Sequence, residues 1–417
     1  MKKFLLFLLI LLIGFGGYIV YDNYINKGIP KLNVEEQVVN IDELFIYGTH
    51  LSLQGSVIQD ENLDLVLYNG DFIPFKINID DENFSLSDTI NEGMDLESIP
   101  VGNYFAFLRS STKDENDKDI FRYYTLKNNT DYKETTYYTF SNVGNKILIN
   151  TDDEYETITF NVSKNNDNNV YDVVIDPGHG GMDSGANKNG NKESEYTMKI
   201  ASNLKKKMED NGIKVKLTRE DGQLTTNELL EDYGNGGRAV INHEVHAKYL
   251  FSIHLNSNAS QSVNGVEVYT ADKINYDFAT NLAKNIVEMT GSSYSTNKIN
   301  KVTNGVYTRT FRDVDIQSSL AEYARKNMKA YDLTTKSNYY YMIRETGGIM
   351  TGAYVDNRNE PKILGNPYFN SNIGSEAYLL ELGYLTNTND LNNIDKNMEK
   401  YTDAIVTTFK EVYDNSK

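Results

Sequence analysis

Apolar and polar residues alternate in short runs between about residues 28 and 164. In one run, the apolar residues Phe75, Ile77 and Ile79 are separated by polar ones, and residues 158–162 repeat the pattern. Such alternation places one face of a β-strand in a core and the other in water. Clusters rich in Gly, Asn and Asp separate the runs, as turns do. The pattern therefore predicts an all-β, sandwich-like domain over this region.

A different periodicity follows a polar linker at residues 165–170. Residues 173–175 form a continuous apolar run, typical of a strand that is covered on both faces. Apolar positions at helical spacing then occupy residues 200–208, and Gly212 is a suitable C-terminal cap. Strands continue to alternate with helices, which predicts an α/β domain over residues 171–417, with a mostly parallel or mixed sheet flanked by helices.

The start of the chain has the layout of an export signal. Two lysines precede residues 4–20, which carry no charge. Apolar residues continue beyond the glycines of this stretch, so an uncleaved membrane anchor over residues 1–27 is favoured over a cleaved signal. The lysines would then stay in the cytoplasm. We expect an exported protein that is held at the cytoplasmic membrane by this helix, or that is secreted if the segment is cleaved.

Composition narrows the chemistry. The 417 residues include 41 Lys+Arg against 59 Asp+Glu, and the net charge of −18 argues against nucleic-acid binding, which needs cations to neutralise phosphates. The chain has no Cys. Thiolate zinc sites, iron–sulfur clusters, disulfides and cysteine nucleophiles are therefore excluded, and any metal must be held by His, Asp or Glu.

Four such side chains fall where ligands bind to an open α/β sheet, beyond the carboxyl ends of its strands. His179 follows the first predicted strand, His254 ends another, Glu381 lies within an apolar strand and Glu193 begins the first helix. Two histidines and one carboxylate suit a zinc ion that keeps one position open for water. A second carboxylate can take and return a proton. These residues therefore predict a hydrolytic zinc site.

Another histidine pair lies in the segment 228–248, which reads as a helix. His243 and His246 are three residues apart, so they would share a helix face. They lack the His-Glu-x-x-His spacing that places two ligands on one zinc. We expect them not to bind metal, and we expect His50 in the β region to be structural.

Several motifs occur in a fixed order along the second domain, at residues 176–181, 192–193, 218–219, 252–256 and 380–387. With these motifs, the region from 173 to about 391 resembles the catalytic domain of zinc-dependent N-acetylmuramoyl-L-alanine amidases, which trim bacterial peptidoglycan.

The resemblance implies a role for each candidate residue. His179, Glu193 and His254 would hold Zn²⁺, and Glu381 would be catalytic. Glu193 is favoured over Glu195 because it lies at the family's distance from the following Ile-Ala pair. The implied substrate is peptidoglycan, cut at the amide between N-acetylmuramic acid and the L-Ala of the stem peptide.

The sequence also departs from the family pattern. Asp390 stands where the family usually has Glu, and residues 341–344, which look like a family strand, are followed by an insert at 345–375. We expect this insert to be either a substrate-binding flap or a plain surface excursion. We further expect Asn256 and Arg344 to contact the substrate.

Two other functions remain open. A two-carboxylate glycosidase could use Glu193 and Glu381. A non-catalytic wall-binding or amidase-activating protein would be signalled by a missing zinc ligand. Residues 99–104 resemble the final hairpin of immunoglobulin-like accessory modules, which implies that the β domain is a spacer or wall-binding module.

Overall fold

The computed structural model describes residues 32–416, apart from 33, 59, 61, 81, 153, 221–236, 326–332, 354–367 and 369. The expected anchor at residues 1–27 and part of the insert lie outside the described residues. Within the described part of the chain, no helix has the length and apolarity needed to cross a membrane.

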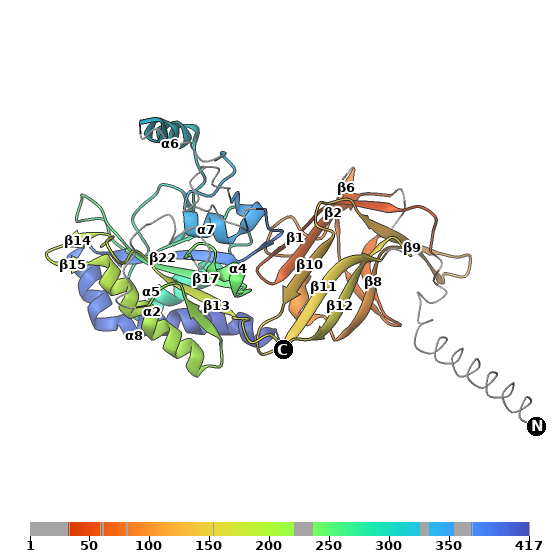
Figure 1. Cartoon of the computed structure of the whole chain (residues 1–417), viewed down its shortest axis with the longest axis horizontal. Coiled ribbons are helices and arrows are strands. Elements are labelled where there is room, and N and C mark those ends of the chain that lie inside the picture. The colour runs from red at the N-terminus through yellow and green to blue at the C-terminus, as the bar shows by residue number, and fades with distance from the viewer. Residues whose placement is uncertain are drawn as a thin grey trace, which may run out of the picture.

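The N-terminal region is built of strands (Figure 1), with one large apolar core and a smaller apolar cluster around Phe107. Its sheet runs in the order β10-β11-β12-β8-β9-β1-β2-β6-β5, with β3, β4 and β7 pairing alongside. Its elements are β1 (Val39–Tyr47), β2 (His50–Ser56), β3 (Asp64–Tyr68), β4 (Phe72–Phe75), β5 (Asn78–Ile79), β6 (Asn83–Ser85), β7 (Met94–Asp95), η2 (Leu96–Ser98), β8 (Gly102–Lys113), β9 (Asp119–Asn128), β10 (Glu134–Tyr138), β11 (Asn145–Asp152) and β12 (Thr157–Lys164).

The C-terminal region contains a seven-stranded mixed sheet in the order β16-β13-β17-β22-β18-β20-β19. Strand β13 is parallel to β16 and β17, β17 is parallel to β22, and β18 is antiparallel to β22. The prediction of a sheet flanked by helices is confirmed. The strands are β13 (Val173–Pro177), β16 (Val215–Leu217), β17 (Tyr249–Asn256), β18 (Glu267–Thr270), β19 (Lys301–Thr303), β20 (Val306–Thr308) and β22 (Glu376–Tyr384).

Helices cover both faces of this sheet. Helices α2 (Glu193–Asp210), α5 (Asp277–Thr290) and α8 (Thr388–Asn415) pack on the face that carries Ile175, Phe251 and Leu380. The opposite face meets α4 (Ile241–Glu244) and α7 (Tyr341–Thr346). The smaller elements are β14 (Asn187–Lys188), β15 (Asn191–Lys192), α6 (Asp313–Arg325), η3 (Gly348–Thr351) and β21 (Ile373–Gly374).

Local sequence explains the first long helix. Ile200, Leu204 and Met208 follow one another at helical spacing, and each is fully buried. Gly212 follows the helix with φ of +80°, a conformation that costs glycine little, and its N–H donates to the Glu209 carbonyl. The predicted cap is thus confirmed.

Two secondary-structure predictions are wrong. Residues 341–344 belong to helix α7 instead of a strand, because the Arg344 N–H donates to the Tyr340 carbonyl four residues earlier and Ile343 packs toward the sheet. A short apolar run does not distinguish the two structures. In the segment 228–248, the described residues form only the short helix α4, and His246 has a left-handed φ of +55°.

The two regions are joined by shared core and shared sheet. Strand β21 pairs in parallel with β1 of the β region. Phe140, between β10 and β11, is fully buried in the core of the C-terminal region. Polar contacts reinforce this joint, since Lys248 Nζ donates to the Thr139 carbonyl at 2.9 Å and the Ser141 N–H donates to Asp172 Oδ1 at 2.6 Å.

Candidate metal centre

The turn after β13 presents His179 at the edge of the sheet. His179 has a left-handed φ of +61°, which is uncommon for a residue with a side chain and frequent at functional sites. Gly178 precedes it, and a Cβ atom there would lie 2.4 Å from the His254 ring. Glycine therefore lets the backbone of the turn approach the second histidine closely.

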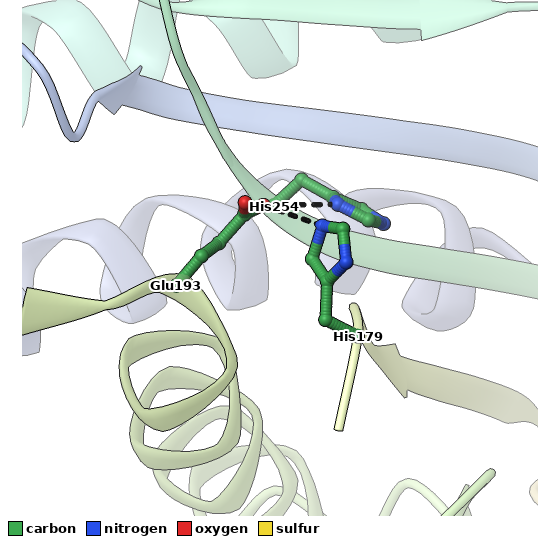
Figure 2. A group of neighbouring side chains, drawn as sticks. All are labelled: His179, Glu193 and His254. Atoms are coloured by element: carbon green, nitrogen blue, oxygen red, sulfur yellow. Dashed lines mark hydrogen bonds and ion pairs between the residues drawn. The ribbon is translucent and has the colours of Figure 1, made fainter. Parts of the chain in front are cut away.

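His179, Glu193 and His254 converge on one point (Figure 2). Their ligand atoms all lie within 4.8 Å of one another. Glu193 Oε1 is 3.1 Å from His179 Nε2 and 3.1 Å from His254 Nδ1. Two ligand atoms on a tetrahedral zinc are about 3.3 Å apart, so these two pairs already fit the spacing of such a site. Two histidines and one carboxylate are therefore a group that could hold a metal ion.

Neighbouring groups orient the three side chains. The other ring nitrogen of His179, Nδ1, is 2.7 Å from Asp183 Oδ2, a carboxylate contact that fixes the ring and leaves Nε2 for a metal. The N–H groups of Leu255 and Ala186 donate to the Glu193 carboxylate at 3.0 Å and 2.9 Å. These contacts hold the ligands in place before a metal binds.

Contacts among His179, Glu193 and His254 also shift the pKa values of Glu193 and His179. Burial would raise the pKa of Glu193, but hydrogen bonds from His179 and His254 outweigh it and hold that pKa well below its ordinary value. Burial lowers the pKa of His179, while Glu193 and Asp183 raise it, with a net increase. These contacts favour the anionic form of the Glu193 side chain. Glu195 is mostly exposed and pairs with Lys192.

Glu381 lies beside this group. In the parallel pairing of β17 with β22, its register partner is His254, so both side chains leave the same face of neighbouring strands. Its Oε2 atom is shielded from solvent and has no hydrogen-bond partner among the described residues. Burial, followed by the charges of Glu193 and Glu267, raises its pKa well above the ordinary value. An unpaired carboxylate oxygen is costly, which marks a functional group.

Sequence reasoning missed a second buried acid in the same row. Glu267 on β18 is the antiparallel partner of Glu381 and is fully buried. Its carboxylate accepts hydrogen bonds from Tyr269 Oη at 2.7 Å, Ser295 Oγ at 2.5 Å, Tyr384 Oη at 2.5 Å and Asn256 Nδ2 at 3.3 Å. The available signal was an acid inside an apolar strand, the same signal that identified Glu381.

The two expected substrate contacts have different environments. Asn256 lies at the end of β17, and its side chain is held by Glu267 and by the Ser257 N–H. Arg344 is buried, and its guanidinium donates to Glu345 Oε1 at 2.8 Å and to the Asn338 carbonyl at 2.9 Å. These contacts hold the Arg344 side chain inside the protein, and its contact with substrate stays a prediction.

The second histidine pair lies at the joint between the two regions. His243 is buried, with Nε2 3.2 Å from the Glu345 carbonyl and its ring stacked on Tyr368. His246 packs against the ring of Tyr138 from the β region. The two rings contact different partners, and neither belongs to the group of ligand atoms around Glu193.

Two arginines connect the strand ends beneath the site. Arg238 donates to both oxygens of buried Asp176 at 2.9 Å and 3.0 Å. Arg219 donates to the carbonyls of Pro177, Gly178 and Ser194. The turn that carries His179 is thereby tied to the first residues of the helix that carries Glu193.

A protein-family model described as N-acetylmuramoyl-L-alanine amidase matches residues 173–410, more than half of the chain. The chain belongs to this family. The resemblance inferred from the motifs is therefore confirmed, and the matched part of this amidase-family chain contains His179, Glu193, His254 and Glu381.

Individual relatives match shorter parts of the amidase-family chain. The probable cell wall amidase LytH of Staphylococcus saprophyticus subsp. saprophyticus is 40% identical over 100 residues, which are 23% of this chain and 30% of that protein. LytH of Staphylococcus aureus is 34% identical over 100 residues, with the same two coverages. The chain thus matches less than a third of the length of these relatives.

Solved structures are similar at lower identity. The catalytic domain of CwlV, an N-acetylmuramoyl-L-alanine amidase from Bacillus (Paenibacillus) polymyxa var. colistinus, is 22% identical with a TM-score of 0.38, covering 59% of this chain and 99% of that one. Cwp6 from Clostridium difficile is 23% identical with a TM-score of 0.39, covering 58% of this chain and 29% of that one.

Proposed function

We propose that the protein is a zinc-dependent amidase that hydrolyses the bond between N-acetylmuramic acid and the L-Ala of the peptidoglycan stem peptide. The observation that supports this most directly is the convergence of His179, Glu193 and His254 beside the unpaired carboxylate of Glu381. Family membership supplies the substrate class.

His179, Glu193 and His254 would hold the metal. Zinc, when bound, polarises a carbonyl and lowers the pKa of water to roughly 7. Glu381 would accept the proton of the attacking water and donate it to the nitrogen of the departing L-Ala.

The proposal includes location and domain roles. The export-signal pattern of residues 1–27 supports action outside the cytoplasm, where peptidoglycan lies, with attachment to the cytoplasmic membrane through that segment. Residues 28–164 would be an accessory domain, residues 165–170 a linker and residues 171–417 the catalytic domain.

Digestion of purified peptidoglycan tests the proposal. The wild-type protein should release peptides with a free L-Ala amine, and chelation should stop the release until zinc is restored. Glu381→Gln should bind zinc normally but release almost nothing, because general acid–base catalysis is worth roughly 10²–10⁴-fold in rate. Glu195→Gln, an exposed acid near the site, is the matched control and should behave as wild type.

The alternatives give different products. New reducing ends that persist under chelation would instead identify a glycosidase that uses Glu193 and Glu381. Binding to peptidoglycan without any released fragment, in the presence of zinc, would identify a wall-binding protein. Either result contradicts the amidase proposal.

A further inference from the structure

Aromatic rings line one side of the site, next to Glu381. Tyr269 on β18 contacts Tyr340 at a centroid separation of 4.6 Å, and Tyr340 contacts Tyr339 at 5.5 Å. We refer to Tyr269, Tyr339 and Tyr340 as the tyrosine rim. Tyr339 and Tyr340 are only partly buried, so the rim offers ring surface to a ligand.

The rim is fixed by the backbone behind it. The segment after β20 runs antiparallel to the segment before α7, with the Tyr339 N–H donating to the Arg309 carbonyl at 2.8 Å and the Phe311 N–H donating to the Ser337 carbonyl at 3.0 Å. Buried Arg344 donates to the Tyr339 carbonyl at 3.1 Å. This hydrogen bond from a buried side chain supports the backbone of the rim at Tyr339.

The guanidinium of Arg309 lies over the tyrosine rim. Its guanidinium carbon lies 3.3 Å from the centroid of the Tyr339 ring, and a quarter of its side chain is exposed. Asp315 is 3.7 Å away, but that carboxylate is engaged by Arg312, with both contacts at 2.8 Å. Among the residues that the structure describes, the Arg309 guanidinium donates no hydrogen bond. A planar donor is therefore presented in a fixed orientation.

Contacts connect the rim to an acid beside Glu381 and to Arg309, because Tyr269 Oη donates to Glu267 at 2.7 Å and Arg309 lies over Tyr339. Burial and then the charge of Glu381 raise the pKa of Tyr340 to about 12, and the positive charge of Arg309 opposes this increase. The charges of Glu381 and Arg309 therefore both act on the Tyr340 hydroxyl. A ligand that extends from the site along the tyrosine rim would reach Arg309, which lies over Tyr339.

The charge of the substrate indicates whether its sugar half or its peptide half lies next to Arg309. In the bond proposed above, the carboxyl group of the muramic acid is consumed by the amide, so the sugar half is neutral around the cleavage point. Free carboxylates occur only on the peptide half. The zinc ion proposed above would neutralise Glu193, so a carboxylate on the peptide half would be stabilised by a further cation beside the site. Arg309 is suited to this task, because a guanidinium binds a carboxylate through two parallel hydrogen bonds.

We propose that Arg309, seated on the tyrosine rim, binds a carboxylate of the stem peptide and makes the enzyme selective for peptides that carry it. This inference rests on the proposed amidase function. It assigns the departing half of the substrate to the side of the site formed by Tyr339 and Tyr340.

Two soluble muropeptides test the proposal. They differ only in whether the second residue of the stem carries a free α-carboxylate or the corresponding amide. Arg309→Gln should lower kcat/KM on the carboxylate substrate by about 10- to 100-fold, the value of a hydrogen-bonded charge contact, and change the amide substrate little. The loss should fall mainly on KM, because the contact forms equally in the ground and transition states.

Arg325→Gln is the matched control, since Arg325 is an exposed arginine of α6 that pairs with Glu322. It should keep the wild-type preference. Arg309→Lys keeps the charge but loses the planar fork, so it should retain part of the selectivity and remains informative if Arg309→Gln does not fold. Zinc content and melting temperature report on folding.

Three outcomes are decisive. An equal loss on both substrates would show that Arg309 only supports the structure, and an unchanged preference would show that it does not contact the peptide; either overturns the proposal. If wild type cleaves neither substrate but zinc is bound, the proposed amidase function fails instead, independently of Arg309.

Discussion

A substitution at Phe140 tests whether the β region and the catalytic region unfold as one unit. This side chain belongs to the β region, yet its ring lies 6.2 Å from Tyr249, 5.9 Å from Phe409 and 5.4 Å from Tyr413, all in the catalytic region. It is fully buried. Phe140→Ala would leave a cavity in the shared core and should destabilise the protein by about 3–5 kcal/mol.

The expected shift in melting temperature depends on how much of the chain melts together. The unfolding entropy is about 2 cal/mol/K per residue, so a loss of ~4 kcal/mol lowers the midpoint of a 417-residue cooperative unit by about 5 °C. If residues 28–164 melted alone, their own midpoint would fall by about 14 °C. We expect a single transition and the smaller shift, because a side chain of the β region is buried in the core of the catalytic region.

Differential scanning calorimetry of the full chain distinguishes the two cases, with peptidoglycan hydrolysis measured after heating to each temperature. Activity should disappear together with the single transition. Phe121→Ala, which removes an exposed ring from the same region, should leave the midpoint nearly unchanged. Two transitions, of which only the earlier moves while activity follows the later, would refute the shared-core reasoning.

Two further predictions concern ligands and pH. Glu193→Gln should lose bound zinc and Glu195→Gln should keep it, as measured by metal analysis; the reverse pattern would make Glu195 the ligand. His243 is buried as the neutral imidazole, and burial lowers its pKa to about 4. The unfolded chain binds that proton more readily, so urea unfolding should show stability falling by up to ~3 kcal/mol as pH drops from about 6.5 to 4. His243→Gln should make the free energy of unfolding depend less on pH between about 6.5 and 4. An equally steep decline in the variant would exclude His243 as its source.

Much of the metal centre follows from the sequence because each residue has a strong local signal. His179 and His254 directly follow apolar runs that form strands, and parallel strands end at the same edge of a sheet. Glu381 stood out as an acid inside an apolar strand. Glu267 gives the same local signal, but its importance depends on the antiparallel pairing that places it beside Glu381, and pairing is not encoded locally.

Other features depend on contacts that are distant in the sequence. Residues 341–344 suit a strand or a helix by pattern alone, and packing against the sheet selects the helix. The burial of Arg344, which we expect to contact substrate, could not be predicted because it depends on Glu345 and on carbonyls of the preceding turn. Arg309 carried no sequence signal at all. Its role in the proposal arises from stacking on Tyr339, a residue 30 positions away along the chain.

The sequence by itself determined the two fold classes, the family and the positions of the zinc-ligand candidates, since hydrophobic periodicity and short motifs are local properties. Tertiary structure decided how these parts meet. It placed Phe140 in the neighbouring core, turned Arg344 inward and left Arg309 exposed over an aromatic ring. These outcomes depend on which surfaces are buried against each other. Such burial is decided only when segments that are distant in the sequence pack together.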